Sequence, residues 1–289
     1  MSTKMITITK KDVKLPKRKK SSHKGDNGYV LCIGGSKEFT GAVILAGLAA
    51  LRSGCDLVKI AAPEKVAWAI NAYSPDLITV KLKGDYLSLS HSYEILKETE
   101  KHDVVLIGNG LSYNEQTNKF VNFIIKKIKK PLIIDADAIK MLNLSEISNA
   151  IITPHHKEFE TLLKNSGYSK LNNIKDMGKK VKELSQGKYI GNNVIILKGE
   201  TDYVLSSRKI LCNKTGNPGM TKAGTGDVLA GLCTGFLAQD KKRNLLQAAI
   251  NATYYNGLIG DILLKKKKGF NFLASDMVEE IERAIRKGF

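Results

Sequence analysis

The chain has 289 residues, of which 43% are hydrophobic, and this is enough to bury a large core. No apolar run approaches the ~20 residues that a membrane-spanning helix needs, and the first five residues lack the apolar stretch of a signal peptide. The four cysteines lie far apart without metal-ligand spacing, so we expect single buried thiols in a reducing compartment. The sequence therefore predicts a globular, cytoplasmic protein with no membrane partner.

The formal net charge is +18, which raises the alternative of a nucleic-acid-binding protein. However, the lysine clusters at 17–20, 126–130 and 265–268 are separated and contain no interleaved aromatic side chains. Such clusters are typical of solvated loops and helix ends. A basic surface also steers polyanionic nucleotides toward a protein. We therefore predict no nucleic-acid partner.

Strands and helices are predicted to alternate along the chain. Apolar runs predict strands at 28–33, 56–61, 77–81, 104–107, 131–134, 151–152, 193–197, 201–205 and 209–213, and helices at 41–51, 64–70 and 118–129, before a mostly helical C-terminal third. This alternation predicts one α/β domain with a largely parallel central sheet flanked by helices on both faces. The helix at 41–51 is rich in alanine and glycine, so we expect it to pack closely against the sheet or a neighbouring subunit.

Glycines and polar residues follow several of these strands. They are Gly34-Gly35-Ser36, Gly108-Asn109-Gly110, Asp135-Ala136-Asp137, Thr153-Pro154-His155 and Lys198-Gly199-Glu200. In open α/β sheets ligands bind beyond the carboxyl ends of the strands, so this rim is the expected site. There is no P-loop motif, and the Gly-Asn-Gly segment lacks the last glycine of a dinucleotide fingerprint.

The loop from Asn217 to Asp227 is the most informative segment, because it is rich in glycine and leads directly into an apolar helical pattern. The N–H groups of the first helical turn have no partner inside the helix and attract anions. We therefore predict an anion hole at Ala223, Gly224, Thr225 and Gly226. The carboxylate of Asp227 would lie beside it, which suits a general base for phosphoryl transfer. The alternative is an ordinary helix start with a favourable acid in its first turn.

The rim motifs and this loop together resemble a known family. The matching segments are residues 25–36, 39–42, 107–111, 134–138, 153–158, 197–199 and 213–227. In this order they resemble the ADP- or ATP-dependent NAD(P)H-hydrate dehydratases of the ribokinase-like superfamily, over nearly the whole chain. The sequence departs from the family pattern at several loop positions. Asn109 stands where proline is usual, and Ala223 stands where glycine is common.

The resemblance implies an enzyme of metabolite repair with a ribokinase-like fold. It would convert the S-epimer of NADHX or NADPHX to NAD(P)H by phosphorylating the C6 hydroxyl and eliminating phosphate. ADP or ATP would be the phosphoryl donor, with Mg²⁺ as cofactor and no metal ligand assigned. Residues 1–24 would form a basic N-terminal segment and 25–289 the dehydratase domain, without a fused epimerase domain. A separate epimerase would then serve the other epimer, and a homotetramer is implied.

Carried over residue by residue, the resemblance also implies two subsites. The hydrate site would contain Ala42, Gly110, His155 and the catalytic Asp227. The adenine nucleotide (ADP, ATP or AMP) would contact Lys198, Gly199, Glu200, Thr201, Asp202 and Gly226.

Each assignment has a structural alternative. Ala42 and Gly110 can simply be packing residues, and His155 can cap the helix that begins near Lys157. The segment at 198–202 can be a tight turn between antiparallel strands with an exposed lysine. A thiazole or pyridoxal-type kinase of the same fold is the nearest alternative function.

Overall fold

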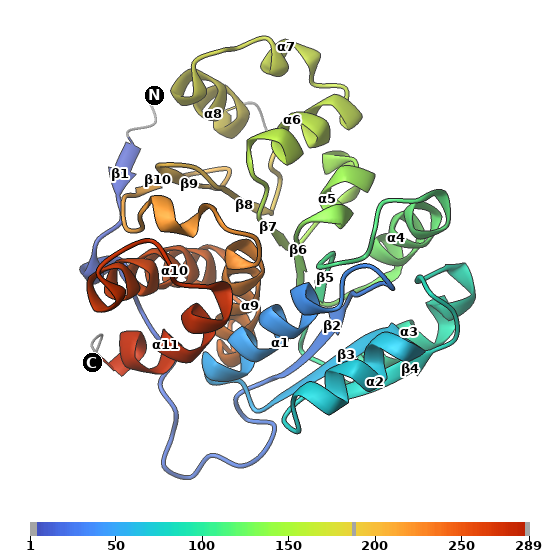
Figure 1. Cartoon of the computed structure of the whole chain (residues 1–289). Coiled ribbons are helices and arrows are strands. Elements are labelled where there is room, and N and C mark those ends of the chain that lie inside the picture. The colour runs from blue at the N-terminus through green and yellow to red at the C-terminus, as the bar shows by residue number, and fades with distance from the viewer. Residues whose placement is uncertain (1–4, 187–188, 287–289) are drawn as a thin grey trace.

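In the computed structural model, which describes residues 5–186 and 189–286, ten strands form one sheet in the order β1-β10-β9-β8-β7-β6-β5-β2-β3-β4 (Figure 1). The strands are β1 (Met5–Thr7), β2 (Tyr29–Ile33), β3 (Leu57–Pro63), β4 (Ile78–Leu82), β5 (Val104–Ile107), β6 (Leu132–Ile134), β7 (Ala150–Ile152), β8 (Val194–Leu197), β9 (Asp202–Leu205) and β10 (Ile210–Asn213). All neighbouring strands from β8 to β4 in this order are parallel, whereas β9 is antiparallel to β8 and to β10. The predicted largely parallel sheet is therefore confirmed.

The helices are α1 (Gly41–Arg52), α2 (Glu64–Tyr73), α3 (Ser92–Glu100), α4 (Glu115–Lys127), α5 (Asp137–Met141), α6 (His156–Asn165), α7 (Ser169–Asn172), α8 (Met177–Gln186), α9 (Thr225–Gln239), α10 (Leu245–Lys267) and α11 (Ala274–Arg286). Short 3-10 turns are η1 (Lys10–Asp12), η2 (Leu89–His91), η3 (Leu144–Glu146) and η4 (Pro218–Thr221). No helix among the described residues combines the length and apolar character needed to cross a membrane.

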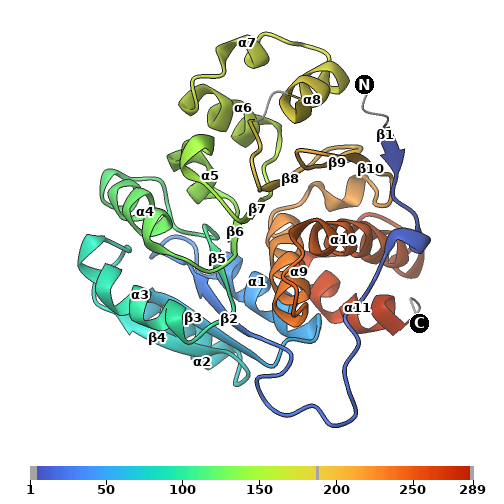
Figure 2. The same cartoon turned by 180° about the vertical axis from the view of Figure 1, so that it is seen from behind.

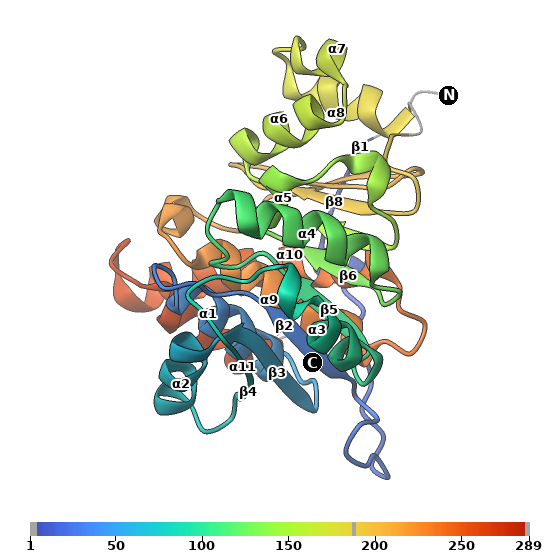
Figure 3. The same ribbon diagram turned by 90° about the vertical axis from the view of Figure 1, so that its right-hand side faces the viewer.

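Helices cover both faces of the sheet, as the alternation predicted. Successive side chains of a strand point to opposite faces. Val30 and Cys32 of β2 belong to the apolar cluster that also contains side chains of α1, α2, α9, α10 and α11. Leu31 and Ile33 belong to the cluster on the opposite face, with side chains of α3 to α8. The reverse view shows the same two groups of helices (Figure 2), and the side view shows α4 and α1 on opposite sides of β5 and β2 (Figure 3).

The N-terminal part of the chain is attached to the sheet. β1 pairs with β10 in parallel, in the register Met5 to Ile210. A few residues later, the N–H of Lys14 donates to Oδ1 of Asn251 on α10 at 3.0 Å. Because β1 has only three residues, it is too short to show the alternation of apolar and polar side chains by which a strand is recognised. This explains why β1 was not predicted.

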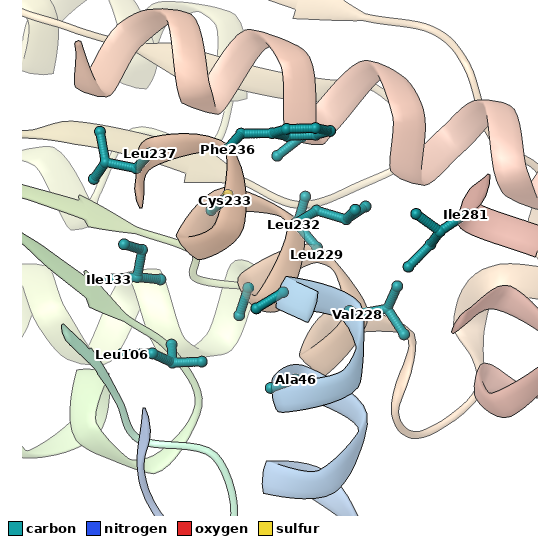
Figure 4. Packing of buried hydrophobic residues seen from close by; sticks show 14 of the residues in the cluster. Ala46, Leu106, Ile133, Val228, Leu229, Leu232, Cys233, Phe236, Leu237 and Ile281 are labelled. Carbon is teal, nitrogen blue, oxygen red and sulfur yellow. The ribbon is translucent and has the colours of Figure 1, made fainter. Parts of the chain in front are cut away.

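Helix α9 runs through the centre of the apolar cluster on one face. Its side chains lie between Leu106 of β5, Ile133 of β6, Ala46 of α1 and Ile281 of α11 (Figure 4). A Cβ atom at Gly231 of α9 would lie only 2.2 Å from the carbonyl oxygen of Ala46. Helices α1 and α9 therefore touch backbone to backbone. This partner of the small-residue helix was not predicted, whereas its predicted close packing on the sheet is seen at Gly47, where a Cβ would lie 3.1 Å from Cδ1 of Ile60 on β3.

Candidate functional site

The carboxyl ends of four neighbouring strands bring polar side chains together at one edge of the sheet. Asn109 follows β5, Asp135 follows β6, Thr153 follows β7 and Lys198 follows β8. Because these strands are parallel and adjacent, the residues after them are neighbours in space although they lie far apart in the sequence. The predicted polar rim is thus a single continuous edge.

Asp227 lies in the first turn of α9 and faces this edge. The preceding N-cap residue, Gly224, has φ of 93°, and a Cβ there would lie 2.7 Å from side-chain atoms of Leu45 and Ala274. A glycine is therefore required for the chain to enter the helix at this point. No described carbonyl or side chain accepts the N–H groups of Gly226 and Asp227. The helix start thus leaves two donors available to an anion.

The surroundings of Asp227 raise the pKa of its carboxyl group into the neutral range. Burial and the neighbouring Asp135 carboxylate raise the pKa of Asp227 to about 7, against the opposing effects of Asn109 and Lys198. Nδ2 of Asn109 donates to Oδ1 of Asp227 at 2.6 Å. A carboxylate with a pKa near the working pH is suited to remove a proton in a general-base step.

Lys198 is the cation of this cluster. Its Nζ lies 3.1 Å from Oδ1 of Asp135 and 4.0 Å from Oε2 of Glu158, while Thr153 Oγ1 donates to the same Asp135 oxygen at 2.6 Å. Burial lowers the pKa of Lys198, but the two carboxylates outweigh burial and raise it overall. Only 21% of the side chain is exposed, so the exposed lysine of the turn alternative is wrong.

The turn itself is present, since residues 198–201 connect the antiparallel strands β8 and β9. Asp202 holds this connection, because its carboxylate accepts the N–H of Gly199 at 3.0 Å and Nδ2 of Asn213 at 3.3 Å. Burial raises the pKa of Asp202. Gly199 and Glu200 are exposed at the turn, and Thr201 is half-buried. The side chain of Asp202 thus has a structural role. A nucleotide that binds at this turn would therefore contact the other residues of the turn.

Both predicted subsites border Lys198. A Cβ atom at Gly226 would lie 3.2 Å from Nζ of Lys198, so the turn after β8 and the start of α9 meet at this ammonium group. On the other side, His155 and Lys198 form an isolated parallel β-bridge. The structure therefore brings together Lys198, Gly226, His155 and Asp227, which the sequence analysis had divided between two ligands.

His155 is the N-cap of α6. Its Nδ1 accepts the N–H of Glu158 at 3.3 Å, and its own N–H donates to Oε2 of Glu158 at 2.9 Å, which completes a capping box. The helix-cap alternative therefore describes what His155 does in this structure. Burial and the nearby Lys198 lower the pKa of His155, which favours the neutral form of its ring. Half of the side chain is exposed, which leaves a ligand contact open as a prediction.

Ala42 and Gly110 adjoin one another beside the loop after β2. Gly110 has φ of 72°, and a Cβ there would lie 2.6 Å from the carbonyl oxygen of Phe39 and 3.4 Å from Cβ of Ala42. Packing and backbone conformation alone therefore account for glycine at 110. A bulky residue at Gly110 would strain the fold, so Ala42, which is half-buried, is the better position at which to probe the hydrate site.

The loop before α9 is anchored by its own motif residues. The N–H of Gly216 and Nδ2 of Asn217 each donate to the Asp261 carboxylate on α10 at 3.1 Å. The hydroxyl of Thr225 donates to the carbonyl of Met220 at 2.7 Å, so it serves the loop. Ala223 is exposed. Within the predicted anion hole, only the backbone N–H groups at the start of α9 are therefore available to bind a ligand.

Asn109, Asp135, Thr153 and Glu158 are parts of the site to which the sequence analysis assigned no role. Each stands in a recognised motif, but a single polar residue after a strand does not reveal its partners. The described residues contain no group of three or more His, Cys, Asp or Glu side chains that could hold a metal ion. Surface depressions of about 550 and 600 Å³ also occur, and none of the predicted site residues lines either of them.

The turn between Asp135 and Asp137 is strained. Ala136 has φ of 51° and ψ of −125°, a conformation that favours glycine. Ala136→Gly is therefore expected to raise the free energy of unfolding by about 1 kcal/mol, since relief of the strain exceeds the added chain entropy. Urea unfolding would measure this change. The control Ala138→Gly, within α5, should lower stability instead, and a destabilised Ala136→Gly variant would contradict the assignment of strain.

Comparison with known proteins shows which family the chain resembles. The sequence profile of the NAD(P)H-hydrate dehydratases matches residues 30–283. The bifunctional NAD(P)H-hydrate repair enzyme Nnr of Methanocaldococcus jannaschii is 41% identical over 94% of this chain and 51% of its own length. The ADP-dependent (S)-NAD(P)H-hydrate dehydratase of Cenarchaeum symbiosum is 36% identical over 94% of this chain and 93% of its own. The chain thus spans about half the length of the bifunctional relatives it matches.

A crystal structure of the ADP/ATP-dependent NAD(P)H-hydrate dehydratase from Bacillus subtilis, co-crystallized with ATP/Mg²⁺, has a TM-score of 0.79 to this chain. It is 25% identical, and the similarity covers 99% of both chains. A ribokinase-like superfamily protein from Enterococcus faecalis has a TM-score of 0.83 at 26% identity over 98% of this chain and 96% of its own, so the predicted ribokinase-like fold is confirmed. The profile covers most of the chain, and the Cenarchaeum relative matches it nearly end to end. This chain belongs to the NAD(P)H-hydrate dehydratase family.

Proposed function

We propose that residues 25–289 catalyse the adenine-nucleotide-dependent dehydration of the S-epimer of NADHX or NADPHX. With ADP as donor, hydrate and ADP would give NAD(P)H, AMP and inorganic phosphate. The hydroxyl oxygen of the hydrate leaves in the phosphate, so no free water is released. The proposal draws on the family assignment and on the relatives whose names state this activity.

One feature of the site carries the proposal. Asp227, with a pKa of about 7, lies at a helix start where two N–H groups have no protein acceptor. A base beside an anion-binding helix terminus is the arrangement that phosphoryl transfer to a hydroxyl group requires. An ordinary acid at a helix start does not need this degree of burial or a second carboxylate nearby.

The first step would be transfer of the terminal phosphoryl group to the C6 hydroxyl. Asp227 would take the hydroxyl proton while the hydroxyl oxygen attacks phosphorus and the bond to the donor's bridging oxygen breaks. The N–H groups of Gly226 and Asp227 and the ammonium of Lys198 would stabilise the negative charge on the transferring group. In the second step the lone pair of the ring nitrogen would expel phosphate, and loss of a proton from C5 would restore the dihydropyridine.

Magnesium is proposed as the cofactor, because phosphates on the donor require charge compensation. Mg²⁺ in such sites is usually held by one or two carboxylates together with phosphate oxygens and water. The absence of a cluster of three metal-ligating side chains among the described residues agrees with an ion that enters on the nucleotide.

The deciding experiment is an assay of the purified chain on chemically prepared NADHX and NADPHX, with ADP and ATP tested side by side. We expect the absorbance of the dihydronicotinamide to appear together with one equivalent of free phosphate. A phosphorylated product that accumulates without this absorbance would identify a kinase of the same fold. No turnover with either donor would refute the proposal.

Further properties follow from the same proposal. We propose a cytoplasmic location and assembly into a homotetramer. Light scattering of the purified chain would test the assembly, and a monomeric mass would exclude it.

A further inference from the structure

Asn109 connects the two carboxylates of the site through one amide nitrogen. Its Nδ2 donates to Oδ1 of Asp227 at 2.6 Å and to Oδ2 of Asp135 at 2.9 Å. The residue is only 1% exposed. Among the described residues no other side chain donates a hydrogen bond to the Asp227 carboxylate. The orientation of that carboxylate therefore depends on Asn109.

The backbone of Asn109 is fixed by the strand next to β5. The N–H of Gly35 donates to the Asn109 carbonyl oxygen at 2.9 Å. A Cβ at Gly34 would lie 2.4 Å from the same oxygen, so only glycine allows β2 to approach this closely. The amide that bridges the carboxylates is therefore attached to a rigid part of the sheet.

The second carboxylate is held just as firmly. Asp135 accepts a hydrogen bond from Thr153 at 2.6 Å and lies 3.1 Å from Nζ of Lys198, both on its Oδ1. Its Oδ2 is the atom that meets Asn109. Asn109 thus links Asp227 to a carboxylate whose position is already fixed by other groups.

The other end of the Asn109 amide has no partner. Its Oδ1 is buried, and no described group donates to it. A flipped amide would instead place this oxygen against two carboxylates, so the observed orientation is forced. A buried carbonyl oxygen without a hydrogen bond opposes folding. Asn109 is therefore a poor choice for stability alone, which points to a role at the site.

We propose that Asn109 is a positioning residue for Asp227, holding its carboxylate in the orientation that receives the substrate proton. The role of Asp227 as base rests on the proposed function. The bond to Asn109 itself is independent of the substrate. Asn109 acts through Asp227 and need not touch the reacting atoms.

The charges around Asp227 determine how loss of the hydrogen bond from Asn109 would change the pKa of Asp227. Asp135 and Asp137 disfavour its ionised form, whereas Lys198 and the hydrogen bond from Asn109 favour it. Removal of the amide leaves the two acids in place, so the pKa of Asp227 should rise from its value of about 7. A hydrogen bond to a charged group corresponds to a shift of about 1 pH unit or more.

The test compares Asn109→Leu, which keeps the size of the side chain but removes its hydrogen bonds, with the native chain. The acid limb of the kcat/KM profile should move up by about 1 pH unit, which lowers kcat/KM about fivefold at pH 7. Recovery toward high pH and an unchanged Kd for nucleotide should accompany the shift. Asn122→Leu is the matched control, because Asn122 on α4 donates to the carbonyls of Asn118 and Met141 away from the site.

A titration of the Asp227 carboxyl by ¹³C NMR, assigned with Asp227→Asn, separates this inference from the proposed function. A higher Asp227 pKa in Asn109→Leu but not in Asn122→Leu supports the positioning role, even if the native chain does not turn over the hydrate. An unchanged Asp227 pKa in Asn109→Leu would overturn it. So would a loss of activity that is equal in both variants and independent of pH.

Discussion

Asp227→Asn is expected to lower turnover of the hydrate by at least about 10²–10⁴-fold, the range typical of a lost general base. Asparagine keeps the shape of the side chain and can still accept the hydrogen bond from Asn109, but it cannot take up a proton. Affinity for the hydrate should be largely kept. Single-turnover kinetics with NADHX would measure the loss. Near-normal turnover in this variant would remove Asp227 from the mechanism.

The native enzyme should also show a matching pH dependence. A base must be ionised to act, so kcat/KM is expected to rise with pH through the Asp227 pKa of about 7 and then level off. This limb should be missing from the residual activity of Asp227→Asn. A native profile that is flat between pH 6 and pH 8 would contradict the assignment.

The same substitution should make the protein more stable at alkaline pH. The pKa of Asp227 is raised in the folded state, so the stabilising contribution of its protonated form is full below the ordinary pKa of 3.8 and is lost as pH rises through about 7. The asparagine that replaces it carries no charge at any pH. A gain of about 1 kcal/mol or more at pH 8, shrinking toward pH 4, is therefore expected from urea unfolding. Retained stability would also show that the lost turnover is not caused by misfolding.

Much of the fold follows from local pattern. The inner strands β2, β3 and β5 to β8 are nearly continuous apolar runs, because a parallel sheet covered on both faces buries most of their side chains. The elements without this signal were missed. β1 has three residues at the sheet edge, and α3 is a short helix with polar residues on its solvent side. Edge strands and short amphipathic helices depend on tertiary packing more than on their own sequence.

The sequence predicted which edge of the sheet carries the candidate site, but it did not predict which side chains contact one another there. Position after a strand identifies the rim to which Asp135 and Lys198 belong, because parallel topology brings strand ends together. It does not reveal that Lys198 pairs with Asp135 rather than with solvent, or that Asn109 bridges two acids. These contacts depend on side-chain directions across three strands, which sequence spacing does not encode. His155 shows the converse, since its role as the cap of the helix that begins near Lys157 was among the interpretations of the sequence.

Lys198 is the residue whose loss should disturb the site most broadly. Its ammonium is the cation nearest the buried carboxylates of Asp135 and Glu158, whose side chains are 2% and 6% exposed. Removal of one partner from a buried ion pair costs about 3–5 kcal/mol, because the remaining charge has no compensation. Lys198→Met, which keeps most of the apolar stem, is therefore expected to lower the free energy of unfolding by about this amount at pH 8.

The loss should be smaller at pH 5, where the raised pKa of Glu158 allows it to become neutral on losing its cation. Lys119→Ala is the matched control, since the Lys119–Glu115 pair is 63% and 83% exposed and should contribute less than about 1 kcal/mol. Equal effects at the two positions would mean that the Lys198 pair is effectively solvated.

Lys198→Met should also weaken nucleotide binding, because the ammonium lies beside the start of α9 at Gly226, where the phosphates are proposed to bind. Loss of a charged contact to phosphate corresponds to roughly tenfold or more in Kd. Calorimetry with ADP and AMP, at a temperature where circular dichroism shows the variant to be folded, would measure it. Affinity for the hydrate should change far less. If nucleotide affinity is unchanged in the folded variant, Lys198 serves only to neutralise Asp135 and Glu158, and the phosphates must be held by the backbone of the loop before α9.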